Sequence, residues 1–337
     1  MSKIYEALRQ AEADRAKGNT NQPDSKSNTS TSSQALLDAV EVRPVFSSEI
    51  RALTALAPTN SLTAEKVPAI ATPNESSAAA DMLAGTSMID LANVAQVVWH
   101  PSLEQLPALE ERGNAVEQFR SLRSRMQEFR DLNKLKSILV SSGLPQEGKS
   151  FVAVNLAISF ARHKAGRVLL IDGDMRRATL HKLLGCSQGP GLTEFLAGDA
   201  SIVDIMQRPA PNEPGRPLPN GLASLTFIPA GTEHDKAADL SGNHRFDQLI
   251  AAAAPHFDWI VVDSSPVNLV SDGVNLARAC DAALLVARGG VTKFEVAQRA
   301  IIELKASKIL GFVLNAVKNP TIAGGYYGYD GYDKIEA

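Results

Sequence analysis

Residues 143–150 combine the residue types that bind a phosphate group. They read GLPQEGKS and match the pattern G-x-x-x-x-G-K-S in full. Glycines let the backbone turn its N–H groups toward an anion, and Lys149 has the charge and reach to contact β- and γ-phosphates. An apolar stretch precedes this segment and a helical pattern follows it, which disfavours a chance glycine-rich turn. The residues predicted to contact a nucleoside triphosphate here are Gly143, Leu144, Pro145, Gln146, Glu147, Gly148, Lys149, Ser150 and Phe151.

Three aspartates follow apolar runs at positions suited to hold a cation beside that phosphate. Asp172 and Asp174 end the run VLLIDGD, and Asp263 ends WIVVD. Magnesium prefers oxygen ligands, so we predict a Mg²⁺ site formed by Ser150, Asp172 and Asp263. The alternative for each aspartate is an ordinary cap at a strand end, and it weighs most on Asp174. The predicted catalytic residues are Lys149, Asp172, Asp174 and Asp263.

Two further polar residues are candidates for the same site. Arg176 follows Asp174 closely and is equally compatible with a phosphate contact and with a solvated loop position. Asn315 ends the apolar run FVLN, where its amide could read a purine edge. Turn chemistry explains an asparagine there almost as well. The pattern favours adenine only moderately.

The C-terminal stretch YYGYDGYDKIEA concentrates another kind of chemistry. The chain contains five tyrosines, and four of them are Tyr326, Tyr327, Tyr329 and Tyr332. Glycines and aspartates separate them, and no apolar neighbours accompany them, which argues against a packed role. The alternative is a tail without a specific function. We predict that these hydroxyls accept phosphate.

Alternating apolar strands and amphipathic helices must position all of these groups. The runs KSILVSS, RVLLIDGD, SLTFIPA, DWIVVDSS, AALLVAR and ILGFVLNAV read as strands. They are continuously apolar, so both faces of the sheet must be covered. Helices are expected from about 116 to 132, from Lys149, and over 244–254 and 292–305. The predicted fold is an α/β, doubly wound, mostly parallel P-loop sheet with helices on both faces.

The sequence of residues 1–108, about a third of the chain, indicates no packed domain. Residues 1–18 read as a short helix with a thin apolar stripe, and residues 19–108 as a low-complexity, disordered linker with a transient helix near 78–95. The predicted α/β domain spans 109–320, and the tyrosine-rich tail spans 321–337.

Composition excludes several function classes. The net charge is −3, which calls for no nucleic acid partner. Two distant cysteines and six scattered histidines predict neither a disulfide framework nor a zinc site. No secretory signal or membrane-spanning run is evident, so a cytoplasmic protein is expected.

These motifs in this order resemble the bacterial tyrosine kinase (BY-kinase) family. Residues 143–150 match its Walker A motif and residues 263–266 its Walker B motif. Asp172, Asp174 and Arg176 match its second, "Walker A-prime" motif. The resemblance covers about 110–337. It implies a P-loop fold related to division-site and plasmid-partition ATPases, with ATP and Mg²⁺ as cofactors and the clustered tyrosines as autophosphorylation sites.

The resemblance also implies partners. Glu117, Arg120 and Arg123 match the family's E-x-x-R-x-x-R motif, which in relatives mediates assembly into a ring. On spacing alone they are equally an ordinary charged helix face. Other implied partners are a membrane chain-length-determinant (polysaccharide co-polymerase) protein as activator and a cognate tyrosine phosphatase. The implied role is control of exopolysaccharide or capsule synthesis, chain length or export, at the inner face of the membrane through that activator.

The sequence departs from the family pattern at a few positions. Gln146 stands where many members have glycine, and Ala178 replaces a common proline. Leu144 occupies the position of the signature lysine of partition-type ATPases, which disfavours that rival function. A second rival is an ATP-gated scaffold of a polysaccharide exporter that phosphorylates nothing. It would not need clustered tyrosines.

Overall fold

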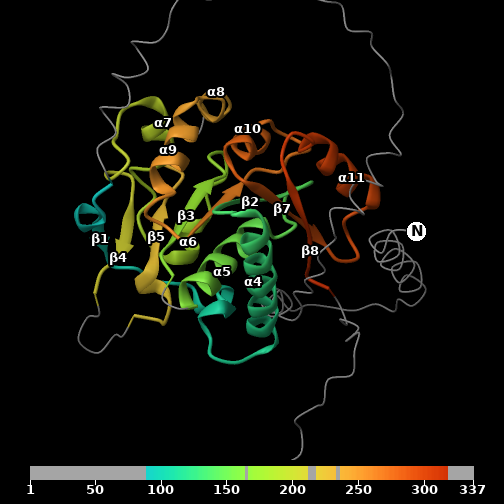
Figure 1. Cartoon of the computed structure of the whole chain (residues 1–337), viewed down its shortest axis with the longest axis horizontal. Helices are drawn as coiled ribbons and strands as arrows, with labels where there is room; N and C mark the ends of the chain where they lie inside the picture. Colours follow the sequence, from blue (N-terminus) through green and yellow to red (C-terminus); the bar gives the residue numbers. More distant parts are fainter. Residues whose placement is uncertain (1–88, 164–165, 212–217, 233–235, 318–337) are drawn as a thin grey trace, which may run out of the picture.

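The computed structural model describes residues 89–163, 166–211, 218–232 and 236–317. Within these ranges the fold is built on one eight-stranded sheet with the order β1-β4-β5-β3-β6-β2-β7-β8 (Figure 1). All neighbouring strands are parallel except β4 and β5, which pair antiparallel. The strands are β1 (Ala95–Val97), β2 (Ser137–Ser142), β3 (Val168–Gly173), β4 (Gln207–Pro209), β5 (Leu225–Ile228), β6 (Trp259–Ser264), β7 (Ala282–Arg288) and β8 (Ile309–Asn315).

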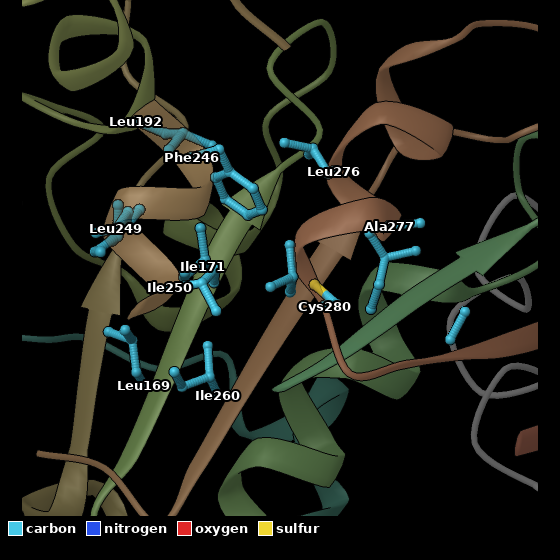
Figure 2. Close-up of a cluster of buried hydrophobic side chains, with 14 of the residues drawn as sticks. Leu169, Ile171, Leu192, Phe246, Leu249, Ile250, Ile260, Leu276, Ala277 and Cys280 are labelled. Atoms are coloured by element: carbon cyan, nitrogen blue, oxygen red, sulfur yellow. The ribbon is translucent and has the colours of Figure 1, made fainter. Parts of the chain in front are cut away.

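Helices cover both faces of this sheet, as the apolar strand runs predicted. On one face, α4 (Asn114–Asn133), α5 (Lys149–Arg162) and α6 (Leu180–Leu184) pack against alternate residues of the central strands. On the other face the remaining helices do the same, with side chains such as Phe246 and Leu276 meeting Ile171 of β3 (Figure 2). These helices are α7 (Leu192–Ala197), α8 (Ala237–Ser241), α9 (Arg245–Ala253), α10 (Asp272–Ala279) and α11 (Phe294–Glu303).

The predicted strands and long helices are confirmed to within a few residues. α4 begins at Asn114, two residues before the predicted start, and it buries the predicted stripe of Val116, Phe119, Leu122 and Met126. Sequence patterns missed β4 and α10, which are short and carry few apolar residues of their own. No helix in the described ranges is both long and apolar enough to cross a membrane.

The predicted boundary between linker and domain at residue 108 is wrong. Residues 89–109, here called the strap, are part of the fold. Trp99 and Leu106 are buried in the core on the α5 face, and β1 extends the sheet beside β4. The side chain of Asn155 on α5 accepts from Ala108 N at 3.0 Å and donates to the carbonyl of Gln105 at 3.2 Å. Isolated apolar residues joined by 3₁₀ turns carry no period, so no pattern signalled this packing.

The other predictions for residues 1–88, including the short N-terminal helix, lie outside the described residues. So do the predictions for the tyrosine-rich tail.

Candidate nucleotide site

The predicted phosphate loop joins the end of β2 to the start of α5. β2 ends at Ser142 and α5 begins at Lys149. Gly148, at the N-terminus of α5, has φ 96°, and a Cβ there would lie 1.9 Å from Nδ2 of Asn315. Gln146 also has a positive φ, 63°. Glycine adopts this left-handed conformation more readily than other residues, so Gln146 introduces a small backbone strain.

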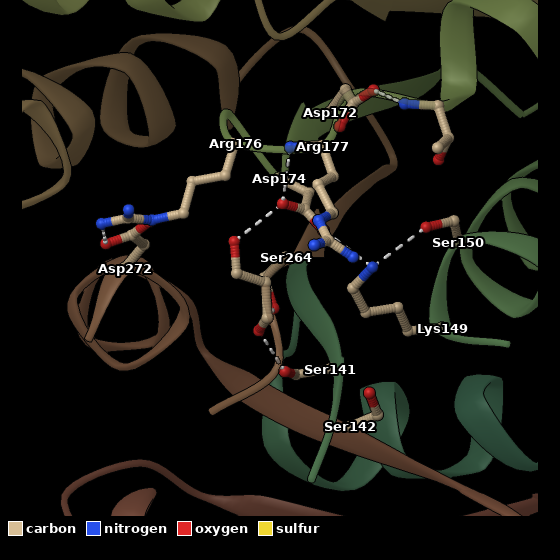
Figure 3. Close-up of polar contacts among 12 residues, drawn as sticks. Ser141, Ser142, Lys149, Ser150, Asp172, Asp174, Arg176, Arg177, Ser264 and Asp272 are labelled. Carbon is tan, nitrogen blue, oxygen red and sulfur yellow. Dashed lines mark hydrogen bonds and ion pairs between the residues drawn. The ribbon is translucent and has the colours of Figure 1, made fainter. Parts of the chain in front are cut away.

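The three predicted aspartates meet Lys149 at the carboxyl edge of the sheet. Asp172 and Asp263 are direct partners in the pairing of β3 with β6. Nζ of Lys149 lies 2.8 Å from Oδ2 of Asp174 and 3.4 Å from the hydroxyl of Ser150 (Figure 3). The other oxygen of Asp174 accepts a hydrogen bond of 2.9 Å from the hydroxyl of Ser265. Parallel strands place their carboxyl ends together, which is why residues 91 positions apart converge here.

Burial and mutual repulsion shape the charge of this cluster. Asp172 and Asp263 are both fully buried. Burial, with repulsion from Asp263, raises the pKa of Asp172 well above its ordinary value. Burial also raises the pKa of Asp263 to about 6, although the nearby ammonium of Lys149 opposes that rise. Burial lowers the pKa of Lys149, but the attraction of Asp263, Asp174 and Asp172 outweighs it and leaves that pKa raised. Three carboxyl groups therefore share one ammonium, and burial favours the protonated forms of Asp172 and Asp263.

The donor set fits a magnesium ion. Oδ1 of Asp172 and both carboxyl oxygens of Asp263 are buried without a hydrogen-bond partner. Buried oxygens of this kind are costly unless something satisfies them. Among the described residues no group of three or more His, Cys, Asp or Glu side chains is arranged to hold a metal alone. Magnesium in phosphate sites takes one or two carboxylates and completes its shell with phosphate and water, so Asp263, Asp172 and Ser150 are sufficient protein ligands.

Arg176 lies away from the cluster. Its Nε lies 2.6 Å from Oδ2 of Asp272, the first residue of α10 (Figure 3). The bond with that carboxylate raises the pKa of Arg176. In this structure the guanidinium is held by a protein carboxylate. A phosphate contact of Arg176 stays a prediction.

Two other predicted contacts are oriented differently from the expectation. Nδ2 of Asn315 donates to the carbonyl of Glu147 at 3.0 Å, so this amide holds the phosphate loop and its reading of a purine stays a prediction. The ring of Phe151 packs against Phe119 of α4, with ring centroids 5.8 Å apart. Its side chain belongs to the core, and any contact with a nucleotide would come from its backbone.

Sequence reasoning treated Glu147 only as a member of the loop. The structure buries its side chain to 4% exposure. Its carboxylate accepts hydrogen bonds from the N–H of Leu144, at 2.8 Å, and from the hydroxyl of Thr292. No signal in the sequence pointed to Thr292, which lies 145 positions away.

The residues predicted to assemble a ring are divided by the fold. Glu117 and Arg120 form an exposed ion pair on α4. Arg123 donates to the carbonyl of Ser159 on α5 at 3.1 Å, so its guanidinium is engaged inside the subunit. Burial, with the nearby guanidinium of Arg120, lowers its pKa. Of these three residues, only Glu117 and Arg120 have charged groups that face the solvent.

The comparisons with known proteins define the class. The chain is 33% identical to the tyrosine-protein kinase CpsD of Streptococcus pneumoniae over 203 residues, which cover 59% of this chain and 84% of CpsD. The solved kinase domain of the Escherichia coli tyrosine kinase ETK superposes with a TM-score of 0.58 at 28% identity, over 67% of this chain and 85% of that domain. No protein-family model matches the chain.

The chain belongs to the bacterial tyrosine kinase family. It is also 30% identical to the tyrosine-protein kinase Wzc of Salmonella typhimurium over 223 residues, 65% of this chain. That match spans 29% of the length of Wzc. The P-loop site of the present chain is of the nucleotide-binding kind.

Proposed function

We propose that this chain is an ATP-dependent protein-tyrosine autokinase. It transfers the γ-phosphoryl group of MgATP to C-terminal tyrosines of a neighbouring copy. The observation that carries the proposal is the cluster of Lys149 with Asp172, Asp174 and Asp263 at the sheet edge where β8 also ends. Because this chain belongs to a tyrosine kinase family and ends in a tyrosine-rich segment, we infer that this edge brings a triphosphate site and the start of that segment together.

The transfer itself needs positioning and charge neutralisation. The phenol oxygen of a tyrosine forms a bond to the γ-phosphorus, and the bond from that phosphorus to the β–γ bridging oxygen breaks, so that ADP leaves. Lys149 and the N–H groups at the start of α5 offset the charge on the phosphates. A bound Mg²⁺, held by Ser150, Asp172 and Asp263, would supply further positive charge there.

The phenol proton must leave during this step, because a phenol with a pKa of about 10 is protonated at pH 7. Asp172 and Asp174 are the two candidates that accept it or hold it. Asp172 keeps one carboxyl oxygen without a partner, while Asp174 is bound to Lys149 and Ser265. The choice between them stays open.

Chain length favours transfer between copies. Tyr326 lies nine positions after Val317, the last described residue, which corresponds to roughly 30 Å of extended chain at about 3.3 Å per residue. A tail of this length reaches the site of an adjacent subunit. The proposed acceptors are Tyr326, Tyr327, Tyr329 and Tyr332.

Assembly and regulation follow from the same charges. We propose a ring in which Glu117 and Arg120 face a neighbouring subunit, with Arg123 holding α4 on α5. Each tyrosine phosphate adds about −1.5 to −2 charges, which would be repelled by the acidic sheet edge and loosen the ring. Gel filtration before and after phosphatase treatment checks the ring, and an unchanged elution volume contradicts the loosening.

A membrane chain-length protein of polysaccharide export would activate the kinase at the inner membrane face, and a cognate phosphatase would reset it.

Incubation of the purified chain with MgATP, followed by intact mass measurement and a phosphotyrosine blot, tests the activity. The expected result is mass added in steps of one phosphate. Deletion of 321–337 should abolish it without changing nucleotide binding, and Lys149→Ala should abolish both. ATP hydrolysis without phosphotyrosine would favour the partition-type switch, and ATP binding without either would favour the exporter scaffold.

A further inference from the structure

We propose that Glu147, Thr292 and Asn315 are positioning residues that brace the phosphate loop in its anion-binding shape. They join the loop to the β7–α11 turn and to the end of β8. The inference deepens the proposed function and rests on it only in taking residues 143–150 as the nucleotide loop.

The side chain of Glu147 closes the loop upon itself. One carboxyl oxygen accepts from Leu144 N, three residues earlier, at 2.8 Å. The hydroxyl of Ser142 donates to the carbonyl of Leu144 at 2.7 Å, so Leu144 is fixed at both its backbone groups. A buried glutamate in a loop that binds anions is unfavourable, since its charge repels phosphate and its burial costs solvation. The hydrogen bonds from Leu144 N and from the hydroxyl of Thr292 offset that cost.

Thr292 connects the other oxygen of Glu147 to the β7–α11 turn. The hydroxyl of Thr292 has one hydrogen, which it donates to Glu147, and it accepts from Arg288 N at 2.8 Å. The N–H of Thr292 donates in turn to the carbonyl of Arg288 at 2.9 Å. Thr292 is 6% exposed, so water does not compete freely for these bonds. The turn therefore holds the carboxylate of Glu147 at a fixed place.

Asn315 attaches the last residue of β8 to the same point of the loop. Its Nδ2 donates to the backbone carbonyl of Glu147, and its own carbonyl accepts from Gly289 N at 2.7 Å. The approach is so close that only a residue without a Cβ fits at Gly148. Glu147 is thus held through its side chain by the turn and through its backbone by β8.

This arrangement predicts a specific property of the apo protein. The backbone of residues 143–148, whose amides lie in the loop, is held in one shape before any ligand arrives, which removes an ordering cost from phosphate binding. Loss of the brace should increase exchange of those amides and weaken nucleotide binding while the core stays intact. A merely structural contact would lower stability and leave nucleotide affinity unchanged.

The test uses the full-length chain with four variants: Thr292→Val, Glu147→Ala, the double variant, and Thr226→Val. Val is nearly isosteric with Thr, and Thr226 on β5 is a buried threonine away from the loop, so it is the matched control. Hydrogen exchange of apo protein is followed by mass spectrometry on peptides covering 143–148. Affinity for fluorescent ADP with Mg²⁺, unfolding temperature and the phosphotyrosine yield are measured on the same samples.

Thr292→Val and Glu147→Ala should each exchange faster in the loop and bind ADP about tenfold more weakly, the effect of losing one or two hydrogen bonds to a charged group. The double variant should be no weaker than Glu147→Ala, because the Thr292 bond is already absent there. Thr226→Val should match wild type in loop exchange and ADP affinity. Wild-type loop exchange and wild-type affinity in Thr292→Val, or additive losses in the double variant, overturn the brace.

The outcomes separate this inference from the proposed function. If wild type binds ADP but forms no phosphotyrosine, the kinase assignment fails and the affinity losses still establish the brace. If wild type forms phosphotyrosine and the variants bind ADP normally, the kinase assignment holds and the brace fails. Should wild type bind no nucleotide, both fail.

Discussion

Arg176 and Asp272 form a two-point ion pair, with Nε 2.6 Å from Oδ2 and Nη2 3.3 Å from Oδ1. The pair links the loop after β3 to the start of α10, residues 96 positions apart. The Asp272 side chain is fully buried, whereas that of Arg176 is 41% exposed. The two partners therefore differ in what their removal leaves behind.

Arg176→Gln should destabilise the protein more than Asp272→Asn. The first leaves a buried carboxylate without its counter-charge, at a cost of about 1–2 kcal/mol given the solvent screening of this pair. The second leaves a guanidinium that water can solvate, and it should cost less than about 1 kcal/mol. Urea unfolding of both variants and the double variant measures this. The double variant should be more stable than Arg176→Gln alone, and the opposite order would contradict the interpretation of the pair.

Lys149→Met and Asp263→Asn should change the stability of the nucleotide-free protein in opposite directions. The first leaves three buried or nearly buried aspartates without their ammonium, which should cost about 2–4 kcal/mol. The second removes a carboxylate whose burial raises its pKa to about 6, so it should stabilise by about 1 kcal/mol. Both should weaken binding of MgADP. Urea unfolding without nucleotide, with calorimetric titration of MgADP, checks the signs, and equal shifts in one direction would refute the charge balance described.

Leu106→Ala should destabilise the domain by about 2–5 kcal/mol, because Leu106 is fully buried under α5 and truncation leaves a cavity. Leu103→Ala in the same strap is the matched control. Leu103 is 56% exposed and should cost within about 0.5 kcal/mol. Thermal and urea unfolding of both variants measures the two losses of stability. Equal, small effects would restore the expectation that this segment is only a linker.

Glu194→Gln should show how one carboxylate contributes to acid stability. Burial acts to raise the pKa of Glu194, but hydrogen bonds from the hydroxyl and N–H of Thr232 and from Gly191 N outweigh it and lower that pKa. A lowered folded pKa stabilises the protein above the unfolded pKa, about 4.3, and this contribution is lost as the pH falls through the folded value. The stability difference between wild type and Glu194→Gln should shrink between about pH 6 and pH 3. Urea unfolding across that range checks it, and a constant difference would contradict it.

Most of the sheet was predictable because the sequence of each strand indicates directly how its two faces are buried. Runs such as VLLID and WIVVD are apolar on both faces, and only the interior of a doubly wound sheet accommodates them. The rule that parallel strands share a carboxyl edge then brought Asp172 and Asp263 to one place, and the structure puts them in register. Local pattern and general topology were enough for these residues.

Other features depend on which distant residue arrives as a neighbour. Nothing near Arg176 indicates Asp272, and nothing near Glu147 indicates Thr292, since each partner lies in a distant part of the chain. The strap escaped prediction for a different reason. Its buried residues, among them Trp99 and Leu106, follow no regular period and find their apolar partners only in distant elements such as α5 and β5. Periodicity reports regular elements and says nothing of irregular ones.

The order of the sheet separates the two ends of the described chain. The described part of the chain begins at Ile89 beside β1, at one edge of the sheet, and ends at Val317 after β8, at the other edge (Figure 1). A partner that binds at the β1 edge of the sheet would therefore leave the β8 edge unobstructed.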